Sequence, residues 1–166
     1  DTSSIPDADT ISAAVLSLWG GAGTADNLTG GASDNSKTYV VASTPASNTA
    51  LVAAAYIQTG TTSFGVGTVW NSIVVGAYND ITLNATGRAA VSQTSITKFA
   101  TRSGWDKDNL VPHTNGITWA ASKDLTFNAN NAETGGTPAT VNDPKLVVTH
   151  AAAAVGMNLM PLLGIG

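Results

Sequence analysis

The sequence predicts an all-β protein, an antiparallel β-sandwich or jelly roll with one or two short helical turns, and two observations lead to this prediction. Charged residues make up only 11% of the chain, against about 25% in an ordinary soluble domain. The polar surface must then come mainly from Thr, Ser, Asn and Gly, which suit strands and turns better than the wet faces of long helices. Short apolar or alternating runs are also separated by Gly-, Pro- and Asn-rich segments, which is typical of a sandwich.

Seven or eight short strands are expected from segments that alternate or are rich in β-branched residues. They are residues 10–19, 37–43, 62–75, 79–84, 95–102, 117–121, 125–130 and 145–150. In the first of them apolar side chains fall on both faces, so both faces are expected to be partly buried. Glycines interrupt residues 62–75, which predicts one bent or bulged strand there.

Two segments predict helical turns instead. Residues 49–56 follow Ser47 and Asn48, which are helix-capping residue types, and they end before Gly60. Residues 85–92 are expected to form a single turn. Apolar positions within the strands predict a core that contains Val15, Leu16, Leu18, Val40, Leu83, Ile96, Phe99, Leu146 and Val148.

A change of composition near residue 150 divides the chain into a single predicted sandwich domain, residues 1–150, and an apolar tail, residues 151–166. The tail carries no charge and is interrupted by Pro161 and several glycines. It is too short and too broken to span a bilayer, which takes about 20 apolar residues, yet too apolar to remain in water. A contact with a neighbouring subunit is therefore predicted for Val155, Met157, Leu159, Met160, Leu162, Leu163 and Ile165.

Charge and cysteine usage exclude several classes of function. The net charge is −4, and the seven Lys and Arg residues are spread singly along the chain, so neither nucleic acid nor an anionic membrane surface is expected as a partner. No apolar run is long enough to predict a membrane span. The chain has no cysteine, which removes disulfides, thiolate metal sites and cysteine nucleophiles. Few charges and no reactive thiols favour an extracellular location.

Three segments carry a resemblance to a known family. Residues 1–20, DTSSIPDADTISAAVLSLWG, resemble the FDLSSIP…A.ISSATLSLY strand of the DNRLRE-type jelly-roll family, and residues 142–150, NDPKLVVTH, resemble its closing PKLVVTY strand. Residues 78–109, YNDITLNATGRAAVSQTSITKFATRSGWDKDN, are similar to a variant of this module in phage structural proteins and in surface proteins of uncultured bacteria. The resemblance covers nearly all of residues 1–150.

The family is related to carbohydrate-binding modules and occurs in secreted proteins. The resemblance therefore implies a β-sandwich used for structure, adhesion or glycan contact, without an enzyme's active site. Such modules usually carry one or two further strands before the SSIP segment, whereas only Asp1 and Thr2 precede it here. This sandwich is therefore expected to lack an edge strand of its own.

No residue pattern predicts catalysis. The two histidines are His113, in a loop after Pro112, and His150, at the end of a predicted strand, and no GxSxG nucleophile turn accompanies them. Glu133 is the only glutamate, and the aspartates cluster in turns, where they typically accept backbone N–H bonds. The chain is expected not to be an enzyme and to need no cofactor.

The loop at residues 103–110 holds the candidate binding residues. Asp106, Asp108 and Asn109 place three oxygen-bearing side chains within four residues, the ligand type that calcium prefers, although the same residues could simply cap a turn. Trp105, between Gly104 and Asp106, is expected to be exposed and to offer its ring to a glycan, although most aromatic residues of a small sandwich are core.

Together these observations predict a non-catalytic structural or adhesive subunit of an extracellular assembly, with copies of itself or other assembly subunits as partners. A virion surface protein of decoration, fibre or tail type is favoured, because the resemblance of residues 78–109 points to phage proteins. A subunit of a cell-surface filament that exchanges strands or tails between neighbours is the first alternative. A secreted carbohydrate-binding module is the second, although it would leave the apolar tail unexplained.

Overall fold

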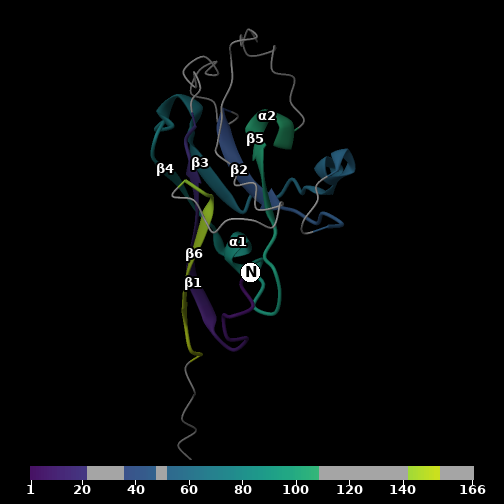
Figure 1. The fold of residues 1–166 in the computed structure, drawn as a ribbon, viewed down its shortest axis with the longest axis vertical. Helices are drawn as coiled ribbons and strands as arrows, with labels where there is room; N and C mark the ends of the chain where they lie inside the picture. Colours follow the sequence, from purple (N-terminus) through teal and green to yellow (C-terminus); the bar gives the residue numbers. More distant parts are fainter. Residues whose placement is uncertain (22–35, 48–51, 109–141, 154–166) are drawn as a thin grey trace, which may run out of the picture.

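The computed structural model describes residues 1–21, 36–47, 52–108 and 142–153 of the 166-residue chain. Two antiparallel three-stranded sheets, ordered β4-β1-β6 and β3-β2-β5, pack together with short helical turns around them (Figure 1). The elements are β1 Thr10–Trp19, β2 Lys37–Ala42, the 3-10 helix η2 Ala53–Gln58, β3 Gly65–Val69, the 3-10 helix η3 Trp70–Ser72, β4 Tyr78–Thr82, α1 Ala85–Ala89, β5 Phe99–Ser103, α2 Gly104–Lys107 and β6 Lys145–Ala151. The predicted β-sandwich with short helical turns is confirmed.

The two sheets are joined where β3 approaches β4. Gly65 and Leu83 form an antiparallel bridge, and the N–H of Asn84 donates to the carbonyl of Phe64 over 2.8 Å. The N–H of Leu83 also donates to the carbonyl of Ala14 in β1, again over 2.8 Å. Backbone pairing therefore closes the sandwich at this corner, and Leu83 is fully buried beside it with 1% of its surface exposed.

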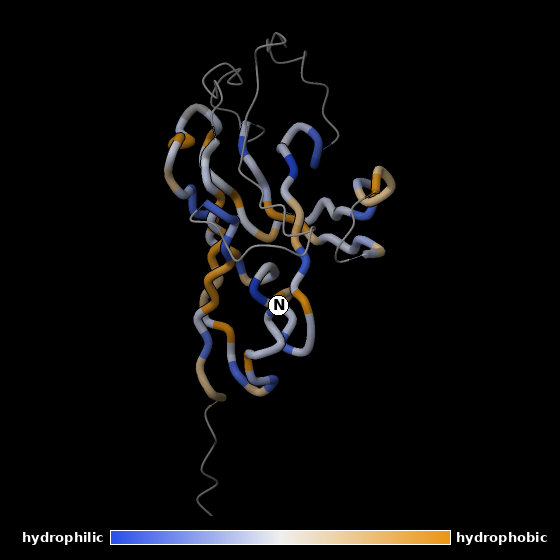
Figure 2. The backbone as a smooth tube through the Cα atoms, in the orientation of Figure 1, coloured by the Kyte–Doolittle hydropathy of each residue, from blue (hydrophilic) through white to orange (hydrophobic). Residues whose placement is uncertain are grey.

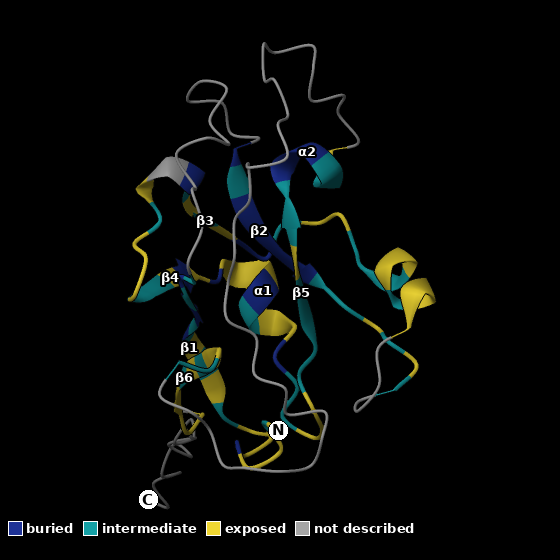
Figure 3. Cartoon of the chain, turned by 45° about the horizontal axis from the view of Figure 1, so that its top comes forward, coloured by how far each residue is buried: buried dark blue, intermediate teal, exposed yellow. Residues whose placement is uncertain are grey.

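The core lies between the sheets (Figure 3). Its buried residues are Ile5, Ala14, Leu18, Val40, Phe64, Ile81, Leu83 and Val91. The expected burial is confirmed for Leu18, Val40 and Leu83, whereas Val15, Leu16, Phe99, Leu146 and Val148 are half-buried.

The prediction is wrong for Ile96, which is 42% exposed. The segment before β5 is a turn rather than a strand, and β5 begins only at Phe99. In this turn the N–H of Ser95 donates to the hydroxyl of Ser92 over 3.0 Å, and the N–H of Ser92 donates to the hydroxyl of Thr97 over 2.9 Å. Local Ser and Thr hydrogen bonds thus compete with the strand and turn Ile96 outward.

Residues 62–75 do not form one long strand as predicted. The strand ends at Val69, and the chain passes through η3 into a loop at residues 73–77. Asn79 holds this loop: its side chain accepts from the N–H of Val74 over 2.8 Å and donates to the carbonyls of Val74 and Ala77 over 3.0 and 3.1 Å. Gly76 completes the turn with a φ of 75°, a backbone region that other residues rarely adopt.

Both predicted helical segments differ in detail from their patterns. Residues 85–92 form α1 over Ala85–Ala89, and Asn84 caps it by accepting from the N–H of Gly87 over 2.9 Å. A methyl group on Gly87 would lie 2.4 Å from the carbonyl oxygen of Phe64, so only glycine lets α1 approach the corner so closely. The second segment forms the 3-10 helix η2, later than predicted and without the expected side-chain cap.

Several predicted features lie outside the described residues. These are the strands at residues 117–121 and 125–130 and nearly all of the tail. The closing strand is confirmed as β6, which pairs with β1 from Ser17↔Lys145 to Thr10↔Ala151. In the described part of the chain, no helix is long and apolar enough to cross a membrane.

Candidate functional site

The predicted binding loop folds as the single helical turn α2. Ser103 caps this turn, because its hydroxyl accepts from the N–H of Asp106 over 3.2 Å. The carboxylate of Asp106 accepts from Nε of Arg102 over 2.5 Å and from the hydroxyl of Tyr56 in η2. Arg102 also donates to the carbonyl of Gly60 over 3.2 Å. Asp106 therefore ties α2 to η2, which lies about 50 residues earlier in the chain.

Charge pairing in this tie shifts the pKa values of its members. The hydrogen bond from Arg102 holds the pKa of Asp106 below its ordinary value of 3.8, against a smaller opposing effect of burial. The pKa of Tyr56 is raised above 10.0, mainly because its hydroxyl donates to the Asp106 carboxylate and must keep its proton to do so. At neutral pH Asp106 and Arg102 are therefore charged and Tyr56 keeps its proton, as the tie requires.

The two predicted calcium ligands that the structure describes already form ion pairs with cationic side chains. Asp106 pairs with Arg102, and Asp108 pairs with Lys107. Asn109 lies outside the described residues. Within the described ranges, no three His, Asp or Glu side chains gather as a metal site would require. Calcium binding at this loop stays a prediction.

Trp105 is buried, so the expectation that it is exposed is wrong. Only 3% of its surface is exposed, and it forms a small second core with Trp70 and the partly buried Ile73. The one-turn helix is responsible, because it turns Trp105 inward instead of leaving it at a loop tip. The Ser-x-x-Asp pattern of Ser103 to Asp106 could have predicted this cap. As placed, the ring offers no face to a sugar.

His150, the histidine that the structure describes, makes a contact with Asp9. Nδ1 of His150 lies 2.6 Å from the carboxylate of Asp9, and this contact joins the end of β6 to the turn before β1. His113 and Glu133 lie outside the described residues. The His150–Asp9 contact is a structural link between β6 and the turn before β1.

An exposed apolar loop is the feature that sequence reasoning did not identify as a site. We call residues 43–47 and 52–60 the finger, because they leave β2, project beside the sandwich and return toward β3 (Figure 1). Its tip holds three large exposed side chains: Val52 is 64% exposed, Tyr56 59% and Ile57 81%. Figure 2 shows this tip as one of the hydrophobic stretches of the backbone. Exposed apolar clusters of this kind often mark contact surfaces.

The neck of the finger is held by backbone pairing. Ser43 and Thr59 form an antiparallel bridge, and the N–H of Gly60 donates to the carbonyl of Ala42 over 2.9 Å. Lys98 donates to the carbonyl of Pro45 over 3.4 Å on one arm of the finger. The other arm is held by the Arg102–Asp106–Tyr56 tie. Both arms are therefore bonded to residues in or next to β5.

The finger belongs to a long stretch of sequence without charge. No Asp, Glu, Lys, Arg or His stands between Lys37 and Asp80. The described residues include eight large hydrophobic side chains that are exposed, and six of them fall in this stretch, the other two being Ile96 and Val147. The six are Val52, Tyr56, Ile57, Val66, Val74 and Val75. This charge-free run is the sequence pattern that could have located the exposed apolar surface.

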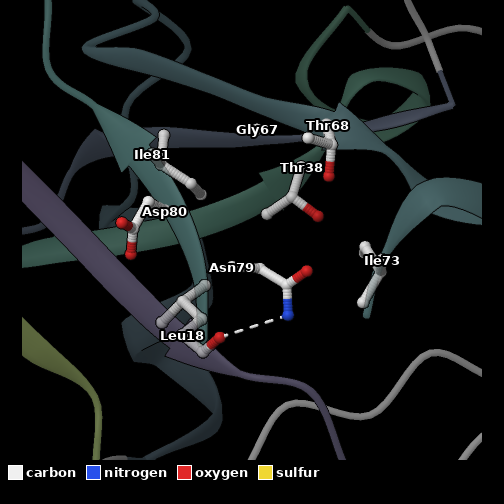
Figure 4. Close-up of a pocket in the computed structure, with 8 residues that line it drawn as sticks. All are labelled: Leu18, Thr38, Gly67, Thr68, Ile73, Asn79, Asp80 and Ile81. Atoms are coloured by element: carbon white, nitrogen blue, oxygen red, sulfur yellow. Dashed lines mark hydrogen bonds between the residues drawn. The ribbon is translucent and has the colours of Figure 1, made fainter. Parts of the chain in front are cut away.

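Figure 4 shows a small hollow between the two sheets. It is lined by Leu18, Thr38, Gly67, Thr68, Ile73, Asn79, Asp80 and Ile81. Its volume of about 10 Å³ gives room for about one water molecule, so it is no ligand pocket. Asn79, on one side of the hollow, donates to the carbonyl of its cross-strand partner Leu18 over 3.5 Å. The hollow therefore borders the loop that Asn79 holds.

The predicted assembly contact lies outside the described residues. Its members are Val155, Met157, Leu159, Met160, Leu162, Leu163 and Ile165. The structure describes the chain to Ala153, just beyond the end of β6. The tail contact therefore stays a prediction.

Comparison with known proteins finds no match to this chain. No family model matches it, and neither does any of the curated proteins or solved structures with which it was compared. The class of protein defined by the structure alone is a small β-sandwich with a projecting apolar finger.

Proposed function

We propose that this chain is a non-catalytic structural or adhesive subunit of an extracellular assembly, and specifically a virion surface protein of decoration, fibre or tail type. One observation carries the proposal: six of the eight exposed large hydrophobic side chains of the described residues lie in the charge-free stretch between Lys37 and Asp80. Such a surface is suited to being covered by neighbours, which are copies of the chain or other assembly subunits.

The physical case rests on the cost of leaving this surface in water. Burying apolar area is worth about 25 cal/mol per Å², so side chains such as Ile57 gain by meeting a partner. The opposing costs are the lost freedom of the associating chains and the desolvation of polar and charged groups at the contact. A stretch without charged residues lowers the desolvation cost, so more of its apolar gain is retained on assembly.

The choice of a virion is supported by the resemblance of residues 78–109 to a module of phage structural proteins. That resemblance also supports an extracellular location and a role without catalysis. A surface glycan remains a candidate partner through the same family likeness, although the buried Trp105 does not favour it.

A cell-surface filament is the second candidate, and the position of β6 favours it. In the described residues β6 pairs with β1 alone, so it stands at the edge of its sheet and leads directly toward the apolar tail. An edge strand presents unpaired backbone groups to which another chain can add a strand. Strand or tail exchange between neighbours would build a filament in this way.

Deletion of residues 155–166 tests the role of the tail. The full chain is expected to form high-mass species in light scattering and regular particles in negative-stain microscopy. The truncated chain is expected to keep its β-rich circular dichroism but to remain a monomer, because the apolar contact is gone. A matched variant of full length, with the apolar residues of the tail replaced by Ser, should behave in the same way.

Two outcomes would contradict this assignment. Assembly that survives the deletion would show that the tail is not the contact. A truncated chain that unfolds as an isolated monomer would show that the tail instead completes its own fold.

A further inference from the structure

The chain carries a groove of about 250 Å³ on the part of the fold formed by α1, β1 and the segment after α1. An apolar cavity of about 150 Å³ accepts benzene, so this groove has room for a guest of that size or somewhat larger. Its lining combines two polar side chains with four aliphatic ones, so a guest that fits it needs both polar groups and carbon surface. The lining residues are Ile11, Ala85, Arg88, Ala89, Val91 and Gln93.

Arg88 is the cationic group of the groove. Among the described residues its guanidinium makes one hydrogen bond, from Nη1 to the carbonyl of Leu83 over 3.3 Å, and takes part in no ion pair. A guanidinium has five N–H donors, and those on Nε and Nη2 form a planar fork that matches the two oxygens of a carboxylate. The bond from Nη1 therefore leaves this fork for a ligand. Since Arg88 is half-buried, water screens its charge only in part.

Gln93 provides the second polar group. Its Nε2 donates to the carbonyls of Pro6 and Asp9 over 2.7 and 3.0 Å. Both bonds require the NH₂ end of the amide, so they fix the amide's orientation and leave the oxygen Oε1 as an acceptor. The groove thus combines a held acceptor with the donors of Arg88, and a hydroxyl group on the guest can satisfy this acceptor.

We propose that this groove binds a small hydroxycarboxylic acid in its ionised form. The carboxylate accepts hydrogen bonds from Nε and Nη2 of Arg88, and the hydroxyl donates to Oε1 of Gln93. A short apolar body covers the side chains of Ile11 and Val91. Each polar group of the groove then keeps a partner when water leaves, which avoids the cost of burying it unpaired. The site lies within one chain, so it does not depend on the proposed assembly function.

A carboxylate suits the groove better than a phosphate group does. A phosphate ester carries about 1.5 to 2 negative charges at neutral pH and has three acceptor oxygens. The groove has one cationic side chain, Arg88, which balances the single charge of a carboxylate. Its four aliphatic residues also favour a guest with carbon surface beside the charged group, which inorganic phosphate lacks.

Saturation-transfer NMR with mandelate, a hydroxycarboxylate with a phenyl body, tests the proposal on the full chain. The method detects weak binding to a monomer or to a large assembly, so its result is independent of assembly. Mandelate is expected to bind in about the millimolar range, because a single partly exposed ion pair contributes little. The neutral amide mandelamide has nearly the same shape and should bind at least about tenfold more weakly. Phenylacetate lacks the hydroxyl for Gln93 and should bind about threefold more weakly.

Substitutions in the groove provide the second arm. Arg88→Gln removes the charge, and Ala89→Leu fills the groove while keeping Arg88; each is expected to raise the Kd of mandelate at least about tenfold. Ala89 is exposed, so its replacement should leave circular dichroism unchanged even where Arg88→Gln disturbs the fold. Lys145→Gln is the matched control and should leave binding as it is. It removes one exposed positive charge from β6, opposite Ser17 and about 20 Å along β1 from Ile11.

The opposite results would overturn the inference. Equal binding of mandelate and mandelamide, or an unchanged Kd in Arg88→Gln, would show that Arg88 does not hold the carboxylate. Equal binding of phenylacetate would remove the role of Gln93. Inorganic phosphate that displaces mandelate at a lower concentration than mandelate itself needs would make the groove a phosphate site instead. No saturation transfer at concentrations well above the millimolar range would refute the site and leave the proposed function standing.

Discussion

Replacing Trp105 by Ala separates a structural role from a binding role. Loss of a buried Trp side chain typically costs about 3–5 kcal/mol. Part of this cost is offset, because the indole N–H of Trp105 is buried without a partner in the described structure, and removing such a group returns about 1–3 kcal/mol. The net loss is then about 2 kcal/mol, and at about 2–4 °C per kcal/mol the melting temperature falls by about 4–8 °C.

The assay is thermal unfolding followed by circular dichroism, with Trp105→Phe as the matched variant. Phe keeps an aromatic ring against Trp70 and Ile73 but carries no N–H, so it is expected to lose clearly less stability than Ala. If Trp105→Ala leaves the melting temperature unchanged, the side chain is not part of a core, and the reasoning from its burial is refuted. Loss of glycan binding together with unchanged stability would restore the sugar contact.

Three further predictions concern the corner and the α2 loop. Gly87→Ala should destabilise the protein by about 1–3 kcal/mol in chemical denaturation, because the added methyl meets the Phe64 carbonyl. Thr86→Ala on the same helix is the control and should have little effect or stabilise slightly. A stabilising Gly87→Ala would contradict the close approach. Millimolar calcium should raise the melting temperature and a chelator should reverse this; no change would leave Asp106 and Asp108 as turn residues alone. Asp106→Asn should lower the melting temperature at pH 6. The difference from the wild type should shrink as the pH falls below about 3.8, because Asp106, whose pKa is lowered in the fold, stabilises it only while the carboxylate is charged. A difference independent of pH would show that the charge of Asp106 does not matter.

The sequence pattern correctly predicted those elements that are determined by residues close to one another in the sequence. The bounds of β1 agree with the prediction, since alternation and β-branched residues extend over its whole length. The helical turn after Asn84 was also expected, and the side chain of Asn84 provides its N-terminal cap. In both cases the residues that decide the structure are neighbours in sequence.

The errors arise where distant contacts decide. Trp105 lies in a polar loop by sequence, yet its burial depends on Trp70, which comes from η3, more than 30 residues earlier in the chain. Ile96 has the spacing of a strand residue, but hydrogen bonds around Ser92 and Thr97 turn its segment outward. The finger could not be located from periodicity because its exposure depends on the pairing of Ser43 with Thr59 and on the tie through Asp106.

Because no charge stands between Lys37 and Asp80, contacts made by this stretch would not be screened by ions. Sodium chloride should therefore leave the assembly nearly unchanged, in contrast to contacts that depend on ion pairs. Ammonium sulfate should strengthen it, because sulfate is excluded from protein surfaces and favours apolar burial, and cooling should weaken it. An assembly with these properties would keep its form in fresh water and in brine, and would be easiest to take apart in the cold.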